Sequence, residues 1–277
     1  MGLFFSHDRS YRVTKFLTNS EKIKEKIETH DNALIPNFNW LDGETFPTKI
    51  EENHRIHARH FALKHVCKGN FTSPIKENIK AGFKILDVGC GSGQWCIEMA
   101  QMFPDVEVYG FDLSPCFPVV KPDWSNFIKE IKRVLKPGGI IEQHECDGLA
   151  HSAGPLLNKV QNTYIHVIST TNDIDLRFAR RLTEVYETAG FENIHESYLS
   201  LALGKWGGRI GEICADNLKQ IYLTMQPWLT PFTGLTEDEY NKIIKQIVVK
   251  ELDEYHSFTN HHIIWAKKKA SSYWWFY

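Results

Sequence analysis

The chain has 277 residues, a length that suits one large α/β domain with additional elements. Hydrophobic residues make up 42% and charged residues 24%, which predicts a buried core and excludes a globally disordered protein. The 32 Lys and Arg residues are balanced by 34 Asp and Glu residues. This balance argues against a dedicated nucleic-acid binder, which would carry a basic excess, so no nucleic-acid partner is expected.

The first 46 residues are polar with weak periodicity and are predicted to form an N-terminal arm. The start, Met1-Gly2-Leu3-Phe4-Phe5-Ser6, matches the loose myristoylation pattern M-G-x-x-x-[ST], a short pattern that also arises by chance. A single myristoyl chain would give only weak, reversible membrane contact. No apolar run reaches the ~18 residues of a membrane-spanning helix, no secretory signal follows the start, and the six cysteines are scattered. These features favour a cytoplasmic or nuclear protein with reduced thiols.

The middle of the chain predicts a strand-helix-strand unit. A helix begins near Pro47 and ends at Gly69-Asn70. A strand over 83–88, a glycine-rich loop, a helix over 94–103 and a second strand over 106–111 follow. This order predicts two parallel strands joined by a right-handed crossover.

The glycine-rich loop Asp87-Val88-Gly89-Cys90-Gly91-Ser92-Gly93 carries the strongest chemical signal. Its glycines can adopt positive φ and let a ligand contact the backbone, and the helix start offers free N–H groups to a carboxylate. A dinucleotide-binding loop would read G-x-G-x-x-G, whereas the third glycine here comes one residue earlier. The spacing therefore disfavours a nucleotide-dependent oxidoreductase. D-x-G-x-G-x-G instead resembles the glycine loop of class I methyltransferases.

An acidic residue ends the next strand, in Gly110-Phe111-Asp112-Leu113-Ser114-Pro115. Asp112 lies 19 residues past Gly93 (112 minus 93). Related nucleotide-binding folds place at this point a carboxylate that accepts hydrogen bonds from both ribose hydroxyls. Taken alone, an Asp at a strand end is more often a turn or cap residue, and it is the glycine loop before it that favours ribose binding.

A wider set of residues resembles a group of fungal methyltransferase-domain proteins, which are similar to the regulatory methyltransferases of secondary metabolism. The set comprises Glu52-x-x-Arg55, His60, Asn70-Phe71-x-x-Pro74-Ile75, the glycine loop, residues 110–115 and the Lys136-Pro137-Gly138-Gly139 joint. The resemblance covers roughly residues 46–118 and 123–147. It implies an α/β, Rossmann-like three-layer fold with S-adenosylmethionine as cofactor. Carried onto this chain, it implies cofactor contacts from Asp87, Gly89, Cys90, Gly91, Gly93, Asp112 and Leu113.

The sequence departs from that family after Pro118. Only 24 residues (136 minus 112) separate Asp112 from Lys136, where the family has a much longer segment. The absent part, expected between Pro118 and Asp123, would hold the third and fourth strands, and the fourth normally lies beside the first in the sheet centre. We expect the strand over 83–88 to pair directly with the one over 140–145, because its backbone groups need partners, leaving about five strands. Two interpretations fit this interval: a degenerate methyltransferase-like protein with weak cofactor binding, or an incorrect gene model or splice form that lacks an exon.

The rest of the chain predicts alternating helices and strands that complete one methyltransferase-like domain over 47–269. Helices are expected over 124–135, 156–169 and 175–189. A further helix follows the glycines at 204–208 and ends at Met225, and the last one begins at Thr236. Strands are expected over 140–145, 194–203 and 259–267. Residues 270–277 form an aromatic tail. His261-His262 lacks partners at metal-like spacing, so no metal site is assigned.

The leading functional hypothesis is a methyltransferase that acts on an acceptor of unknown class: small molecule, protein or lipid. His144 and Glu145, at the end of the strand over 140–145, are candidates for a catalytic base, although a surface pair is the commoner explanation for such residues. The helix segment 51–60 could cover the cofactor, although a solvated helix face is commoner. The competing hypothesis is a non-catalytic scaffold or regulatory protein that keeps the fold.

Overall fold

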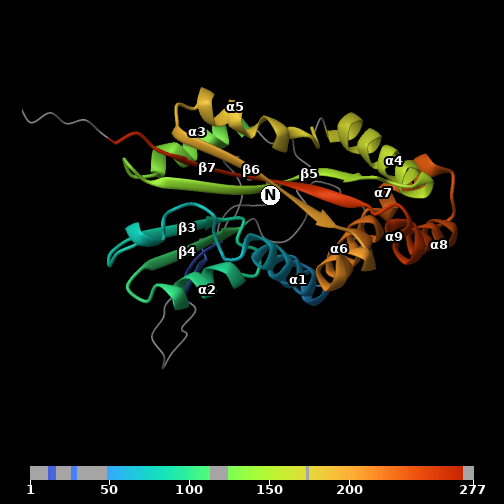
Figure 1. Cartoon of the computed structure of the whole chain (residues 1–277), viewed down its shortest axis with the longest axis horizontal. Helices are drawn as coiled ribbons and strands as arrows, with labels where there is room; N and C mark the ends of the chain where they lie inside the picture. The colour runs from blue at the N-terminus through green and yellow to red at the C-terminus, as the bar shows by residue number, and fades with distance from the viewer. Residues whose placement is uncertain (1–11, 17–25, 30–48, 113–123, 173–174, 271–277) are drawn as a thin grey trace, which may run out of the picture.

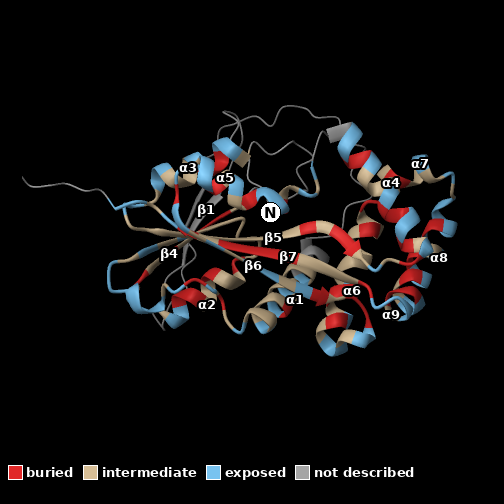
Figure 2. Cartoon of the chain, turned by 45° about the horizontal axis from the view of Figure 1, so that its top comes forward, coloured by how far each residue is buried: buried red, intermediate tan, exposed pale blue. Residues whose placement is uncertain are grey.

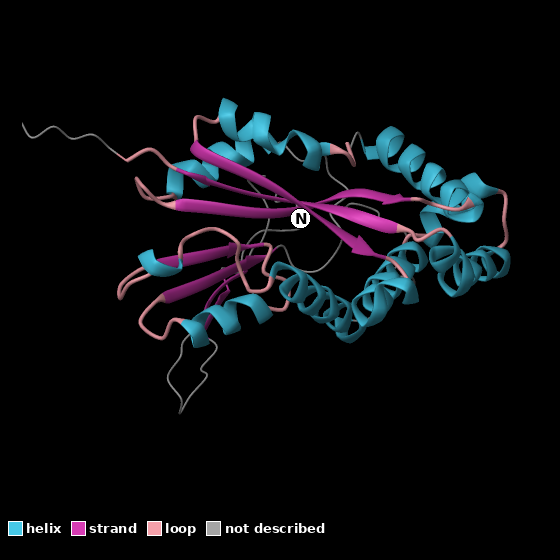
Figure 3. Cartoon of the chain, viewed as in Figure 1, coloured by secondary structure: helices cyan, strands magenta, loops and turns pink. Residues whose placement is uncertain are grey.

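The computed structural model describes residues 12–16, 26–29, 49–112, 124–172 and 175–270. The myristoylation pattern, the predicted cofactor contact Leu113 and the last seven residues lie outside these ranges. The described strands form two separate sheets with helices on their faces, a mixed α/β architecture (Figure 1, Figure 3). The α/β fold class is therefore confirmed.

The first sheet has the order β2-β1-β4-β3. β3 (Lys84–Val88) and β4 (Glu107–Asp112) are parallel, as predicted, and α2 (Gln94–Met102) connects them. β1 (Arg12–Phe16) is antiparallel to β4, with Arg12 opposite Asp112, and β2 (Lys26–Thr29) pairs with β1. Two strands from the predicted N-terminal arm thus extend this sheet beyond β4.

The second sheet has the order β5-β7-β6 and is antiparallel. Its strands are β5 (Ile140–His151), β6 (Glu192–Ala202) and β7 (Phe258–Lys267). β7 lies between the other two (Figure 2), and half of its residues are buried. Residues that alternate along these strands point to opposite faces. One face bears Glu142, His144 and Cys146 of β5, and the other bears Gln143 and Glu145.

Helices cover both faces of the second sheet. α3 (Trp124–Val134) and α5 (Leu182–Thr188) lie on one side, and α1 (Lys49–Cys67) and α6 (Gly208–Thr224) lie on the other (Figure 1). The remaining helices, α4 (Pro155–Asn172), α7 (Gln226–Thr233), α8 (Glu237–Gln246) and α9 (Leu252–Glu254), gather at one end with the largest core cluster. Short turns of helix are η1 (Lys76–Asn78), η2 (Phe178–Arg181), η3 (Lys205–Gly207) and the π-helical η4 (Ile247–Glu251).

The expected direct pairing of the strands over 83–88 and 140–145 is wrong. β3 pairs only with β4 among the described residues, and β5 pairs with β7 in the other sheet. The two sheets share no backbone ladder among the described residues. They are joined instead by side chains: Val88 and Phe111 of the first sheet pack in one cluster with Ile141 and Ile264 of the second.

A second expectation, one helix over 175–189, is confirmed only in part. The helical segment is shorter, and its first turn is the 3-10 helix η2, which runs directly into α5. The capping prediction at Thr236 is confirmed. Its hydroxyl accepts the backbone N–H of Glu239, and the Glu239 side chain accepts the N–H of Thr236 in return.

Within the described residues, no helix is both long and apolar enough to cross a membrane.

Candidate functional site

The glycine loop makes a tight turn between β3 and α2. Gly89, Gly91 and Gly93 all have positive φ, at 87°, 55° and 82°. The amides of Gly89 and Cys90 both donate to the carbonyl of Phe111 on β4, at 2.7 and 3.1 Å. α2 begins at Gln94 without a side-chain cap. The loop is therefore anchored to β4, while the helix start keeps the N–H-rich character that suits an anionic ligand.

Asp112 lies beside this loop, as the sequence spacing predicts. Its Oδ2 accepts the backbone N–H of Gly91 at 2.6 Å. The strand-end carboxylate and the glycine loop thus form one unit. The next residue, Leu113, lies outside the described residues.

Asp87, the first residue of the motif, contacts α2. Its Oδ2 accepts a hydrogen bond from the thiol of Cys96 at 3.5 Å. Burial raises the pKa of Asp87 to about 6, and the charge of Asp112 acts in the same direction, while the Cys96 hydrogen bond opposes them. Asp87 therefore titrates closer to neutrality than an exposed aspartate does.

α1 covers the glycine loop. A Cβ on Gly91 would lie 3.2 Å from Cγ2 of Ile56, so this helix approaches the loop as closely as a glycine permits. At the end of α1, the carbonyl of Asn70 accepts the indole N–H of Trp95 at 2.6 Å. Ile56 supplies this contact with the loop, and a role of segment 51–60 as a cover over the cofactor stays a hypothesis.

Several buried polar atoms near this loop have no hydrogen-bond partner among the described residues. They are the hydroxyl of Ser92 and both amide atoms of Asn70, which is 9% exposed. Such groups are costly unless something bonds to them. The loop, the Asp112 carboxylate and these unsatisfied atoms fit a polar ligand with hydroxyl, amine and carboxylate groups.

A cleft of ≈ 630 Å³ opens between α1 and α2, next to the loop. Glu98 on α2 accepts from Lys64 at 2.5 Å and from Gln94 at 3.1 Å, and His60 lies 3.2 Å away. Burial opposes ionisation of Glu98, but these partners outweigh it and lower its pKa to about 2. This network fixes the two helices that carry the loop and its cover.

The two base candidates, His144 and Glu145, point to opposite faces of β5. His144 faces α1: its Nε2 lies 2.8 Å from Oε1 of Glu142, and its ring lies near the Cys67 thiol. Glu145 shares the other face with Gln143, whose Nε2 donates to it at 3.1 Å. The two side chains cannot act together on one substrate, and their catalytic role stays a prediction.

The charge of His144 bears on its chemistry. Burial lowers its pKa, but Cys67 and Glu142 outweigh that effect and raise it to about 9. Glu142 is itself held by the backbone amides of Thr72 (2.8 and 3.1 Å) and Ser73 (2.7 Å). At neutral pH His144 is therefore an imidazolium, which cannot accept a proton.

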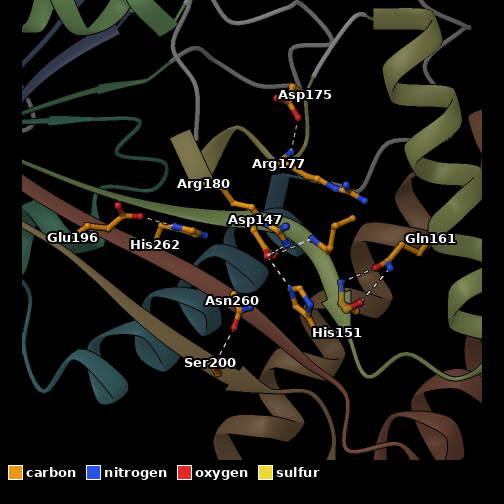
Figure 4. Close-up of polar contacts among 12 residues, drawn as sticks. Asp147, His151, Gln161, Asp175, Arg177, Arg180, Glu196, Ser200, Asn260 and His262 are labelled. Atoms are coloured by element: carbon orange, nitrogen blue, oxygen red, sulfur yellow. Dashed lines mark hydrogen bonds and ion pairs between the residues drawn. The ribbon is translucent and has the colours of Figure 1, made fainter. Parts of the chain in front are cut away.

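A polar cluster on the second sheet escaped sequence reasoning. Asp147, which is fully buried, accepts from His151 at 2.8 Å and from Arg180 at 3.0 Å (Figure 4). On the same sheet, Glu196 lies 2.9 Å from His262 (Figure 4). Asp147 sits where the β5–β7 register shifts, between Cys146 and Ala150, and no sequence pattern marks that irregularity.

Residues 79–117 match the family model described as a methyltransferase domain. The "Secondary metabolism regulator laeA" of Aspergillus niger is 27% identical over 163 residues, 44% of this chain and 44% of the relative. The "Protein-methionine methyltransferase laeA" of Emericella nidulans is 24% identical over 203 residues, 58% of this chain and 53% of the relative. The chain spans about half the length of the curated relatives it matches.

Among solved structures, the phosphoethanolamine N-methyltransferase 2 of Haemonchus contortus is 18% identical, covering 76% of this chain and 57% of that chain. Its TM-score is 0.39, too low to define the fold. The family-model match coincides with the glycine loop and the Asp112 strand end, the two features that the geometry joins. The chain is thus similar to class I methyltransferases of the fungal laeA group.

Proposed function

We propose that this chain is an S-adenosylmethionine-dependent methyltransferase. The hydrogen bond from Gly91 to Asp112 carries this proposal, because it joins the glycine loop to the ribose-binding candidate at the end of the next strand. The matching family model covers the same segment and supports it. When bound, S-adenosylmethionine supplies an activated methyl group on a sulfonium.

The residues would share the binding as follows. The backbone of Gly89, Cys90, Gly91 and Gly93 contacts the methionine end, and Asp112 accepts from the ribose hydroxyls. Asp87 contacts α2 through Cys96. Leu113 is assigned to the same site on the resemblance. α1 covers the loop and excludes water, and alignment of acceptor and methyl group supplies most of the rate enhancement.

The acceptor belongs to this proposal as well. The Emericella nidulans relative is named a protein-methionine methyltransferase, which supports a protein acceptor. A thioether carries no proton to remove, so such an acceptor would need no base. An imidazolium at His144 is compatible with that chemistry.

The competing function is a methyltransferase-like scaffold without catalysis. The division into two sheets favours weak cofactor binding, because the described residues put no strand beside β3 on the side away from β4. In this reading the short interval after Asp112 removes the adenine-binding wall.

Titration calorimetry with S-adenosylhomocysteine separates the two. We expect micromolar binding, and we expect Asp112→Ala to weaken it about 10- to 100-fold through lost hydrogen bonds to a charged group. Asp105→Ala, at an exposed acid in the α2–β4 turn, is the matched control and should bind as the wild type does. No heat at millimolar ligand from a cooperatively folded sample would leave only the scaffold.

A further inference from the structure

Arg59 on α1 lies among groups from three other elements. Arg55, one turn earlier, fixes α1 to α6 through a 2.8 Å hydrogen bond from its Nη1 to Oδ1 of Asn217. Residues four apart share one side of a helix, so Arg59 faces the same way. Its charge acts on three groups there: the thiol of Cys146 on β5, the thiol of Cys214 on α6 and the ring of His261 on β7.

His261 is the most constrained member of this group. It is 6% exposed, lies opposite Cys146 in the β5–β7 ladder, and its Nδ1 is buried without a hydrogen-bond partner among the described residues. Burial lowers its pKa to about 3, and the charges of Arg59 and His144 add to that effect. The ring is therefore neutral, with one donor and one acceptor nitrogen.

The acidic residues nearby are already hydrogen-bonded to other groups. Glu142 is bonded to His144 and to backbone amides, and Asp147 is bonded to His151 and Arg180. No hydrogen bond or ion pair joins Arg59 to another residue in the part of the chain that the structure describes. This corner thus combines the Arg59 guanidinium with an unsatisfied buried ring nitrogen of His261, while Glu142 and Asp147 are hydrogen-bonded to other residues.

We propose that Arg59 and His261 form a binding site for a carboxylate-sized oxyanion. A guanidinium binds a carboxylate or phosphate through two parallel N–H groups, and a neutral ring can donate one more. The site lies one turn of α1 beyond Ile56, which covers Gly91. The occupant is the carboxylate of the cofactor or an anionic group of the acceptor. Only that identity rests on the proposed function.

The first experiment observes His261 directly in the full chain by proton–nitrogen correlation NMR. Sodium acetate and then inorganic phosphate are added, and His261→Asn assigns the signal. We expect a saturable shift of the His261 resonances. Arg59→Gln should weaken the response about 10- to 100-fold, the value of charge-assisted hydrogen bonds. Arg59→Lys should retain part of it, because it keeps the charge but loses the planar fork.

The matched control is Arg209→Gln. Arg209 is on α6, its side chain is 81% exposed, and it lies 3.6 Å from Glu212. The same charge is removed from an exposed side chain that is not among the charges acting on His261, so the acetate response should equal that of the wild type. Thermal unfolding must be cooperative for every variant.

A second arm identifies the occupant by calorimetry with S-adenosylhomocysteine and 5′-methylthioadenosine, which lacks the amino-acid part. If Arg59 holds the cofactor carboxylate, Arg59→Gln weakens only the first ligand, and saturating S-adenosylhomocysteine abolishes the acetate response. If it holds an acceptor anion, the acetate response persists with that ligand bound, and Arg59→Gln leaves both affinities unchanged.

Two results would overturn the site. In the first, acetate and phosphate cause no shift of the His261 resonances. In the second, they cause the same shift in the wild type and in Arg59→Gln. An acetate response without any S-adenosylhomocysteine binding would support the anion site while contradicting the proposed function.

Discussion

The amide nitrogen of Gly91, in the loop after β3, lies 2.6 Å from Oδ2 of Asp112, the last residue of β4. Parallel pairing of β3 and β4 brings these two strand ends together, with Val88 opposite Phe111. A change in either residue therefore affects both the turn and the proposed ribose site.

Gly91→Ala should destabilise the protein more than Gly82→Ala does. Both glycines have positive φ, 55° and 78°, so each substitution carries a left-handed strain of about 1–2 kcal/mol. Only at Gly91 does the new Cβ also meet a neighbour, Ile56 Cγ2 at 3.2 Å, whereas nothing lies within 4 Å at Gly82. Urea unfolding measures the difference. Equal losses would mean that α1 does not press on the loop.

Asp87→Asn should stabilise the fold at pH 7. The folded-state pKa of Asp87, about 6, lies above its ordinary value of 3.8, so the folded state binds the extra proton between these values. Stability is then highest below pH 3.8 and falls as the pH rises towards 6. Removing the charge should recover on the order of 3 kcal/mol at pH 7.

The same variant should show no gain at pH 4, where Asp87 is largely protonated when folded. Unfolding of both proteins at the two pH values is the measurement. A gain that is the same at pH 4 and pH 7 would rule out titration of Asp87 as its cause.

His144 should make stability fall as the solution becomes alkaline. Its folded-state pKa, about 9, lies above its ordinary 6.5. Its stabilising charge is therefore fully present below pH 6.5 and is lost as the pH rises through 9. His144→Gln should flatten stability over this window. His166, which is exposed on α4, provides the control variant His166→Gln, and the wild-type slope should survive in it.

Glu251→Ala should cost about 1–3 kcal/mol, because it leaves helix-start amides without acceptors. Glu251 is 6% exposed, and its carboxylate accepts the N–H groups of Leu156 (3.1 Å) and Leu157 (2.7 Å). Glu254→Ala, nearby and exposed, should cost little. Thermal unfolding of the two variants decides, and equal melting temperatures would contradict the capping role.

The sequence predicts correctly those elements whose formation depends on residues close together in the chain. The glycine turn, the β3-α2-β4 unit and the Thr236 cap each depend on neighbouring residues. It failed where distant segments meet. Nothing near Arg12 indicates pairing with Asp112, and nothing near β5 indicates that the sheet divides beside it.

The same limit applies to the candidate site: local patterns could be predicted, and contacts between distant segments could not. Adjacent strand residues alternate, so the opposed directions of His144 and Glu145 could have been foreseen from the sequence. The charge of His144 could not, because it depends on Glu142 and Cys67 meeting it in space. The grouping of Arg59, Cys146 and His261 likewise needs α1 to cross the second sheet.

The division between the sheets also bears on association between molecules of this protein. Within the described residues, β3 offers one row of backbone groups to no other strand, and Leu86 in its middle is 49% exposed. Such an edge is a template for pairing between molecules. Lys84 at the start of the strand, with a side chain 57% exposed, is the kind of charge that discourages such stacking. Loss of the Lys84 side chain should therefore favour association through this edge at high concentration.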